Sequence, residues 1–180
     1  MRPALLGCLL LVFASDASAH RLDEYLQATR VSVATNRIDV SIDLTPGVAV
    51  ANQVLAVIDQ DRDGQVSGDE CVAYAQRVLK DIRFGLDESV LALGLVDASF
   101  PALHEVKGGL GVLRIKATAP VGPLPAGRHT LTLTNAHLPA ISVYLVNALV
   151  PKDTVIKITK QTRDQLQKDY RLEFQVNSSP

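Results

Sequence analysis

The residues whose types and spacing could do chemistry lie in one stretch, residues 59–70, which reads DQDRDGQVSGDE. Oxygen-bearing side chains stand at positions 1, 3, 5, 9 and 12, with glycine at position 6 and an apolar residue at position 8. This spacing is typical of the calcium-binding loop of an EF-hand, because Ca²⁺ is a hard cation that takes six to eight oxygen ligands. The predicted ligands are three aspartates, a backbone carbonyl at position 7, a serine and a glutamate: Asp59, Asp61, Asp63, Gln65, Ser67 and Glu70.

The last of these residues distinguishes the stretch from an ordinary acidic turn. Asp and Gly are common in surface turns, but such a turn has no reason to place Glu70 at position 12, from which a long side chain can reach back to a metal with both oxygens. Gly64 allows the sharp bend that the loop needs. A second role for Glu70 stays open, because Ser67 and Glu70 also have the spacing of a capping box, in which the glutamate caps its own helix without metal.

Helices are predicted on both sides of the loop. Thr45 followed by Pro46 marks a helix start. Apolar residues recur at helical spacing before and after the loop: Ala51, Val54, Leu55 and Ile58, then Cys71, Tyr74, Ala75, Val78 and Ile82. The order helix, loop, helix is the one that an EF-hand requires, and we expect this insertion at about residues 45–83.

Only one such loop is found in the sequence, although EF-hands usually pair through a short β contact near position 8, here Val66. A lone hand could pair across a homodimer, or its two helices could pack on the rest of the domain and form a fixed structural site. The second arrangement is favoured, because both apolar helix stripes need a surface to cover them.

Outside the helix pair, the sequence reads as β-strands. Apolar and polar residues alternate over residues 38–44, and a segment through Val31 and Val33 is the predicted partner strand. Residues 82–86 and 91–95 predict a hairpin. Further strands are expected near residues 113–117, 128–134, 141–149, 155–159 and 170–176, with a loop at 120–127. Eight or nine short antiparallel strands predict a β-sandwich, so the expected fold class is mainly β with an inserted EF-hand.

The composition limits the functions that the chain can have. It has 180 residues, 47% of them hydrophobic and 21% charged, which suits one globular domain. The net charge of -1 offers no basic field for nucleic acid or an anionic membrane. There is no Trp to stack on sugars or bases. No Gly-x-Ser-x-Gly, His-Glu-x-x-His or phosphate loop is found, so we do not predict an enzyme.

Residues 1–19 are predicted to be a signal peptide. Arg2 precedes an apolar run over residues 4–13, and Ala17-Ser18-Ala19 is a small-residue cleavage site. The predicted domain therefore spans residues 20–180 of a periplasmic or secreted protein. No transmembrane segment is expected after cleavage, because no other apolar stretch approaches the roughly 18 to 20 residues that span a bilayer.

Cleavage would make His20 the first residue, and its α-amine and imidazole could then chelate copper, nickel or zinc. This gives a rival hypothesis, in which the protein delivers a transition metal to a membrane partner.

We expect His104, His129 and His137 to be polar surface or edge residues. His129 and His137 cannot share a metal along one strand unless the chain turns near residues 135–139. Cys71 is expected to be a small core residue rather than a reactive thiol.

Three segments carry a resemblance to a known family: HRLDEYLQA at residues 20–28, LTPGVAV at 44–50 and ISVYLVN at 141–147. They resemble the exported domain of bacterial EF-hand-containing proteins, which is similar to the extracytoplasmic N-terminal region of HupE/UreJ-type hydrogenase/urease accessory membrane proteins. The resemblance implies a calcium loop at residues 59–70 and a link to nickel or cobalt handling, but no transport role, because the transmembrane helices of the membrane members are missing. The sequence therefore predicts an exported calcium-binding domain that acts as a structural or an interaction module. The predicted partner is a periplasmic or membrane protein.

Overall fold

The structure is a computed structural model that describes residues 23–178. In chain order its elements are β1 (Tyr25–Val33), β2 (Arg37–Pro46), α1 (Val48–Ile58), α2 (Gly68–Lys80), β3 (Ile82–Leu86), β4 (Ser89–Leu91), β5 (Gly94–Ser99), α3 (Leu103–Lys107), β6 (Leu113–Pro120), β7 (Gly127–Asn135), β8 (Ser142–Ala148), β9 (Ile156–Arg163) and β10 (Asp169–Val176). The protein is thus mainly β, as predicted. The proposed signal peptide and His20 lie outside the described residues.

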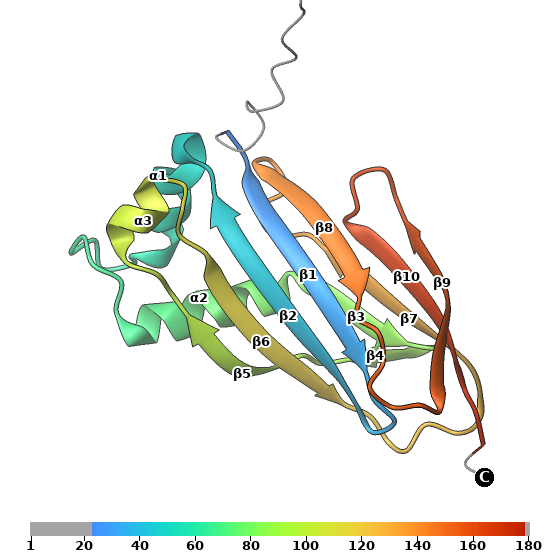
Figure 1. Ribbon diagram of the computed structural model, residues 1–180. Coiled ribbons are helices and arrows are strands. Elements are labelled where there is room, and N and C mark those ends of the chain that lie inside the picture. The colour runs from blue at the N-terminus through green and yellow to red at the C-terminus, as the bar shows by residue number, and fades with distance from the viewer. Residues whose placement is uncertain (1–22, 179–180) are drawn as a thin grey trace, which may run out of the picture.

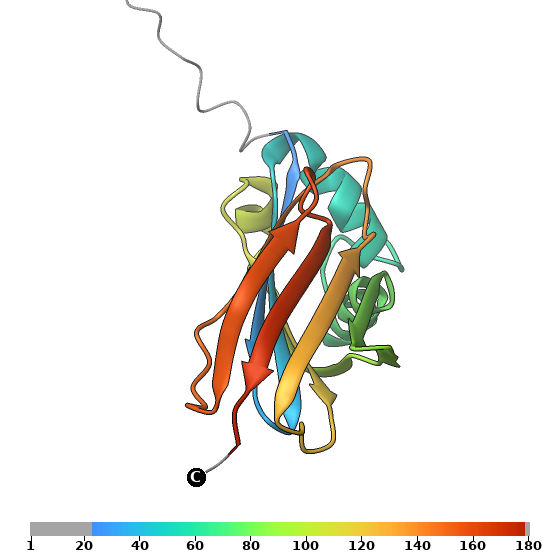
Figure 2. The same cartoon turned by 90° about the vertical axis from the view of Figure 1, so that its right-hand side faces the viewer.

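The strands form two five-stranded sheets (Figures 1 and 2). The first sheet has the order β5-β6-β2-β1-β8, and the second has the order β4-β3-β7-β10-β9. All strand pairs are antiparallel except one, because β8 runs parallel to β1. The expectation of a purely antiparallel fold is therefore wrong at this pair. After β7 in the second sheet the chain crosses to the first sheet, where β8 runs in the same direction as β1.

Alternation along the strands places the core between the sheets. Buried and half-buried residues alternate without interruption along β1, and the same pattern recurs in β2. Side chains of successive residues point to opposite faces of a strand, so this pattern leaves one apolar face on each sheet. Buried residues of both sheets belong to one hydrophobic cluster, including Val31, Ile42 and Ile115 of the first sheet and Leu131, Leu172 and Phe174 of the second.

The predicted hairpin after the helix pair differs from the observed one. β3 and β4 form a hairpin, but β4 ends at Leu91. The chain then leaves the second sheet, and β5 pairs with β6 in the first sheet from Gly94 onward. Leu91 and Leu95 therefore belong to different sheets, although their alternation suggested one strand. Periodicity cannot reveal such a crossing, because the spacing of apolar residues is the same on both sides of it.

The helix pair lies between β2 of the first sheet and β3 of the second. The predicted start of the first helix at Thr45 is early, because β2 continues to Pro46, which pairs with Tyr25 of β1. Gly47 is the N-cap of α1. The second helix, α2, packs against β5 and β3, while α1 and α3 lie together at one end of the molecule (Figure 1). Among the described helices, none has both the length and the apolar character that crossing a membrane requires.

Candidate metal centre

The predicted helices stand on either side of the loop at residues 59–70. The loop begins where α1 ends at the fully buried Ile58, and the Asp59 N–H still donates to the Leu55 carbonyl at 2.8 Å. Gly64 has φ of +80°, a left-handed conformation that glycine adopts without strain. The carboxylates of Asp59, Asp61 and Asp63 come together, with one oxygen from each lying within 4.8 Å of the others. The structure thus brings three of the predicted ligands to one place.

Backbone hydrogen bonds fix the orientation of these carboxylates. The Gly64 N–H donates to Asp59 Oδ2 at 3.1 Å, the Asp63 N–H to Asp61 Oδ1 at 3.1 Å, and the Gln65 N–H to Asp63 Oδ1 at 2.7 Å. The other oxygen of Asp59, Oδ1, is buried and has no hydrogen-bond partner, and it is the single side-chain atom in this situation within residues 23–178. A buried carboxylate oxygen without a partner is costly, so it requires an explanation.

Glu70 does not belong to the aspartate cluster in this structure. It forms the predicted capping box, in which the Ser67 N–H donates to Glu70 Oε2 at 2.9 Å and the Glu70 N–H donates to Ser67 Oγ at 3.3 Å. The Ser67 hydroxyl also donates to Oε2, and the Gln60 N–H donates to Oε1 at 2.7 Å. The N–H of Ser67, its hydroxyl and the N–H of Gln60 lower the pKa of Glu70. The Glu70 carboxylate therefore bridges the loop, because it accepts hydrogen bonds from Gln60 near the start of the loop and from Ser67 near its end.

The remaining loop residues have different surroundings. Gln65 and Ser67 are exposed, while Val66 at position 8 is half-buried and packs against the core of the same chain. Val66 is thus covered from within the molecule.

Two histidines that we expected at the surface are buried. His104 on α3 is exposed, as predicted, but His129 is only 7% exposed and His137 is fully buried. His129 has the same parity in β7 as the buried Leu131 and Leu133, so alternation could have placed it inside. His137 follows the end of β7, as the predicted turn implied, but it lies on the connection between the sheets, where it contacts Tyr74 of α2 and Asp81 just after it.

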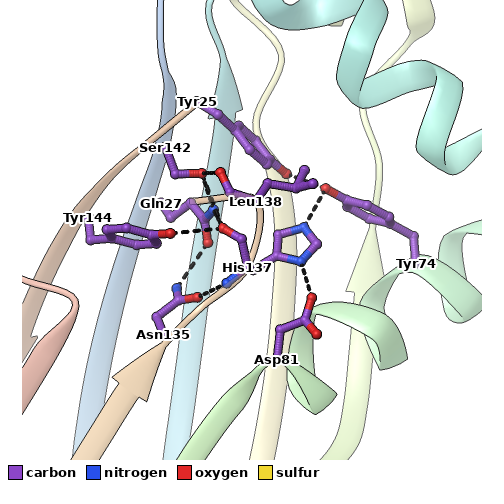
Figure 3. Close-up of polar contacts among 9 residues, drawn as sticks. All are labelled: Tyr25, Gln27, Tyr74, Asp81, Asn135, His137, Leu138, Ser142 and Tyr144. Atoms are coloured by element: carbon purple, nitrogen blue, oxygen red, sulfur yellow. Dashed lines mark hydrogen bonds and ion pairs between the residues drawn. The ribbon is translucent and has the colours of Figure 1, made fainter. Parts of the chain in front are cut away.

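The His137 side chain links α2 to the body of the molecule (Figure 3). Its Nδ1 lies 2.7 Å from Asp81 Oδ2, and its Nε2 lies 3.0 Å from the Tyr74 hydroxyl. The Tyr74 hydroxyl in turn lies 2.8 Å from that of Tyr25 in β1. Burial lowers the pKa of His137, and the nearby Asp81 offsets this only in part. We call these four side chains, Tyr25, Tyr74, Asp81 and His137, the His137 network.

The His137 backbone is held equally firmly. Its carbonyl accepts hydrogen bonds from Gln27 Nε2 at 2.8 Å, Tyr144 Oη at 3.0 Å and Ser142 Oγ at 3.2 Å. Its N–H donates to Asn135 Oδ1 at 3.0 Å, and Asn135 donates to Gln27. Sequence reasoning missed this cluster, although one signal was present: Gln27 shares its strand parity with apolar core residues of β1.

His129 belongs to a separate contact. Its Nδ1 lies 2.9 Å from Asp87 Oδ2, and its Nε2 lies 2.9 Å from the Pro125 carbonyl. Both partners are acceptors, so an imidazolium satisfies both. Burial lowers the pKa of His129, but the Pro125 carbonyl and the Asp87 carboxylate together raise it above the usual value.

Cys71 is half-buried rather than part of the core. The prediction of a core residue is therefore wrong. Burial and the negative charge of Glu70 raise the pKa of its thiol. Because the thiolate is the nucleophile, a raised pKa lowers the fraction of reactive thiolate.

No family model matches the chain, and no curated protein or solved structure shows significant similarity to it.

Proposed function

We propose that this protein is an exported calcium-binding module, built as a β-sandwich that carries an EF-hand insertion. The proposed ligands are the side chains of Asp59, Asp61, Asp63, Ser67 and Glu70 and the backbone carbonyl of Gln65. The resemblance to the exported domain of EF-hand-containing bacterial proteins agrees with this proposal, and it suggests a periplasmic or membrane protein as the partner.

The observation that carries the proposal is the unpartnered Oδ1 of Asp59. A surface turn stabilised only by its own hydrogen bonds has no reason to bury a carboxylate oxygen away from every donor. A cation beside the three clustered carboxylates would supply that partner, and it would also reduce their mutual repulsion. An all-oxygen set of carboxylates and carbonyls suits Ca²⁺ better than softer metals.

The surroundings of the loop favour a structural role over a switch. Val66 packs on the core of its own chain, and the buried stripe of α2 is covered by the sheets. A switching EF-hand opens its helix pair to expose an apolar groove. Here both helices pack on the rest of the domain, α1 against α3 and β2, and α2 against β5 and β3. Extracellular calcium modules bind with dissociation constants on the order of 10⁻⁴ to 10⁻³ M, which gives constitutive occupancy outside the cell.

Calorimetry on the mature protein tests the proposal, with Asp59→Asn and Asp69→Asn as a matched pair. Both substitutions remove one negative charge from the same loop, but Asp69 stands at position 11, outside the ligand pattern. We expect Asp59→Asn to abolish binding at millimolar calcium, and Asp69→Asn to retain it within about threefold, because exposed charges contribute little. Wild-type protein that shows neither binding heat nor a higher melting temperature at millimolar calcium would overturn the proposal.

A further inference from the structure

The helix α2 has the proposed ligand Glu70 near one end and the contacts of the His137 network further along. Glu70 and Tyr74 are four residues apart, so they lie on the same face of the helix. Tyr74 contacts the imidazole of His137 at Nε2, and Asp81, the C-cap of α2, contacts it at Nδ1. One imidazole therefore holds two points of the helix that are about 10 Å apart along its axis. Two such points fix both the axial position and the rotation of a rigid helix.

The backbone of His137 and the hydroxyl of Tyr74 are both hydrogen-bonded to residues of the first sheet. The carbonyl of His137 accepts hydrogen bonds from side chains of β1 and β8, and Tyr25 of β1 contacts Tyr74 directly. The two tyrosines of the network are buried, whereas the Asp81 side chain is 39% exposed and Arg77, whose charge also acts on the imidazole, is exposed. A continuous set of hydrogen bonds thus runs from the first sheet through His137 to α2 and ends at the helix that carries Glu70.

The proton positions in the network follow from the chemistry of its members. The Asp81 carboxylate only accepts, so Nδ1 of His137 carries the proton and Nε2 accepts from the Tyr74 hydroxyl. The oxygen of Tyr74 then accepts from the hydroxyl of Tyr25. Every buried side-chain polar atom of the network has a partner in this order, which needs a neutral imidazole. A fully satisfied buried network of this kind makes one arrangement strongly preferred over others.

We propose that His137 is a positioning residue for the calcium loop: through Tyr74 and Asp81 it fixes α2 so that Glu70 closes over Asp59, Asp61 and Asp63. This inference rests on the proposed calcium function. Calcium then binds to a loop that is already arranged, and little binding free energy is lost in ordering the helix. When the contact to Tyr74 is missing, α2 samples other positions. Only a fraction of the molecules then has Glu70 in place to bind the ion, so the apparent affinity falls.

The test uses Tyr74→Phe, which deletes one hydroxyl and keeps the ring, with Tyr170→Phe as the matched control. The Tyr170 hydroxyl donates to Gln161 at 2.8 Å in the second sheet, away from α2. The calcium dissociation constant is measured by calorimetry and the melting temperature without calcium by scanning calorimetry. We expect both variants to melt earlier, but only Tyr74→Phe to bind calcium more weakly, by about fivefold, the equivalent of one hydrogen bond.

Amide hydrogen exchange without calcium gives a second readout, at Gln60 and Ser67, whose N–H groups donate to Glu70. Tyr74→Phe should speed exchange at both amides, and Tyr170→Phe should not. Equal calcium affinity and equal exchange in wild type and Tyr74→Phe would overturn the positioning role. If wild type binds no calcium, the proposed function fails; faster exchange in Tyr74→Phe would then still support positioning of Glu70 by the network, while unchanged exchange would overturn the positioning role as well.

Discussion

Two carboxylates of the loop at residues 59–70 are in opposite situations. Asp59 has an oxygen with no partner, whereas the oxygens of Glu70 accept three hydrogen bonds from Gln60 and Ser67. A carboxylate offers about four lone-pair sites. An ion in the proposed calcium site would therefore meet no competing donor at Asp59 Oδ1, but it would share the Glu70 carboxylate with the helix cap. We expect Glu70 to approach a metal first through Oε1, which accepts a single one of these bonds.

The two buried histidines respond to pH in opposite directions. The pKa of His129 is raised, so its interaction with Asp87 stabilises the fold fully below the unfolded pKa, about 6.5, and is lost as the pH rises through the folded pKa. The pKa of His137 is lowered by burial, so the unfolded chain binds the extra proton first and stability falls as the pH drops below about 6.5. The groups facing His137 are Tyr74, Arg77 and Asp81 of α2 and Tyr25 of β1.

His129→Gln separates these two contributions. The variant should melt well below wild type at about pH 5.5 and much closer to it at about pH 8, because the lost imidazolium contact acts only on the acid side. The melting temperature of both proteins is measured across this range. His104→Gln, at an exposed position of α3, serves as the control and should follow wild type. A gap between His129→Gln and wild type that is the same at every pH would contradict the assignment.

At the scale of single elements, much of the structure could be predicted from residue patterns. The uninterrupted alternation in β1 and β2 and the apolar stripe of α2 are properties of local sequence, and all three elements occur near the predicted positions. The predicted stripe of α2 extended too far, because Ile82 belongs to β3. The three clustered aspartates are likewise a local feature, since a tight turn brings nearby residues together.

What could not be predicted depends on contacts between distant segments. The parity of a strand shows which residues point inward, but it does not show that Gln27 meets Asn135 or that His137 meets Asp81. Those contacts exist because the chain crosses between the two sheets five times, before β3, β5, β7, β8 and β9. The crossings decide which buried polar groups become neighbours, and the one before β5 and the one before β8 leave no periodic signal in the sequence.

The start of α2 gives a prediction about a single element. Ser67 is its N-cap, and its hydroxyl accepts from the Glu70 N–H. Ser67→Ala should lower the free energy of unfolding without calcium by about 1 kcal/mol, and Ser67→Gly by roughly a few tenths of that, because glycine leaves the helix terminus open to water. Urea denaturation of both variants measures the difference. Equal losses in the two variants would show that the cap does not stabilise α2.

At the scale of the whole molecule, the two sheets approach each other at β8 and β9, where both sheets have an edge strand. Arg163 of β9 donates through Nε to the Val146 carbonyl of β8 at 2.7 Å, and its guanidinium stacks on Tyr170 at 5.3 Å from the ring centroid. The Gln161 side chain accepts from the Ala148 N–H. These side chains cover backbone groups that an edge strand would otherwise offer to another chain.

Arg163→Ala should therefore increase self-association through the outer edge of β8. We expect a concentration-dependent rise in the mass measured by light scattering, together with a small loss of stability, because the carbonyl of Val146 becomes available for strand pairing. Lys160→Ala, at an exposed position on the same strand, also removes one positive charge and is the matched control. If both variants stay monomeric to the same extent as wild type, the edge is protected by something other than Arg163.

The parallel pair of β1 and β8 also has a consequence for the order in which the protein folds. β1 is the first described strand, and its partner β8 lies near the other end of the chain. β1 can pair with β2 early, but its second edge stays open until residues 142–148 have been made and have crossed from β7. Contacts between such distant segments form slowly. Completion of the first sheet is therefore a late step, and a nascent chain that stops before β8 exposes an unpaired edge of β1 to aggregation.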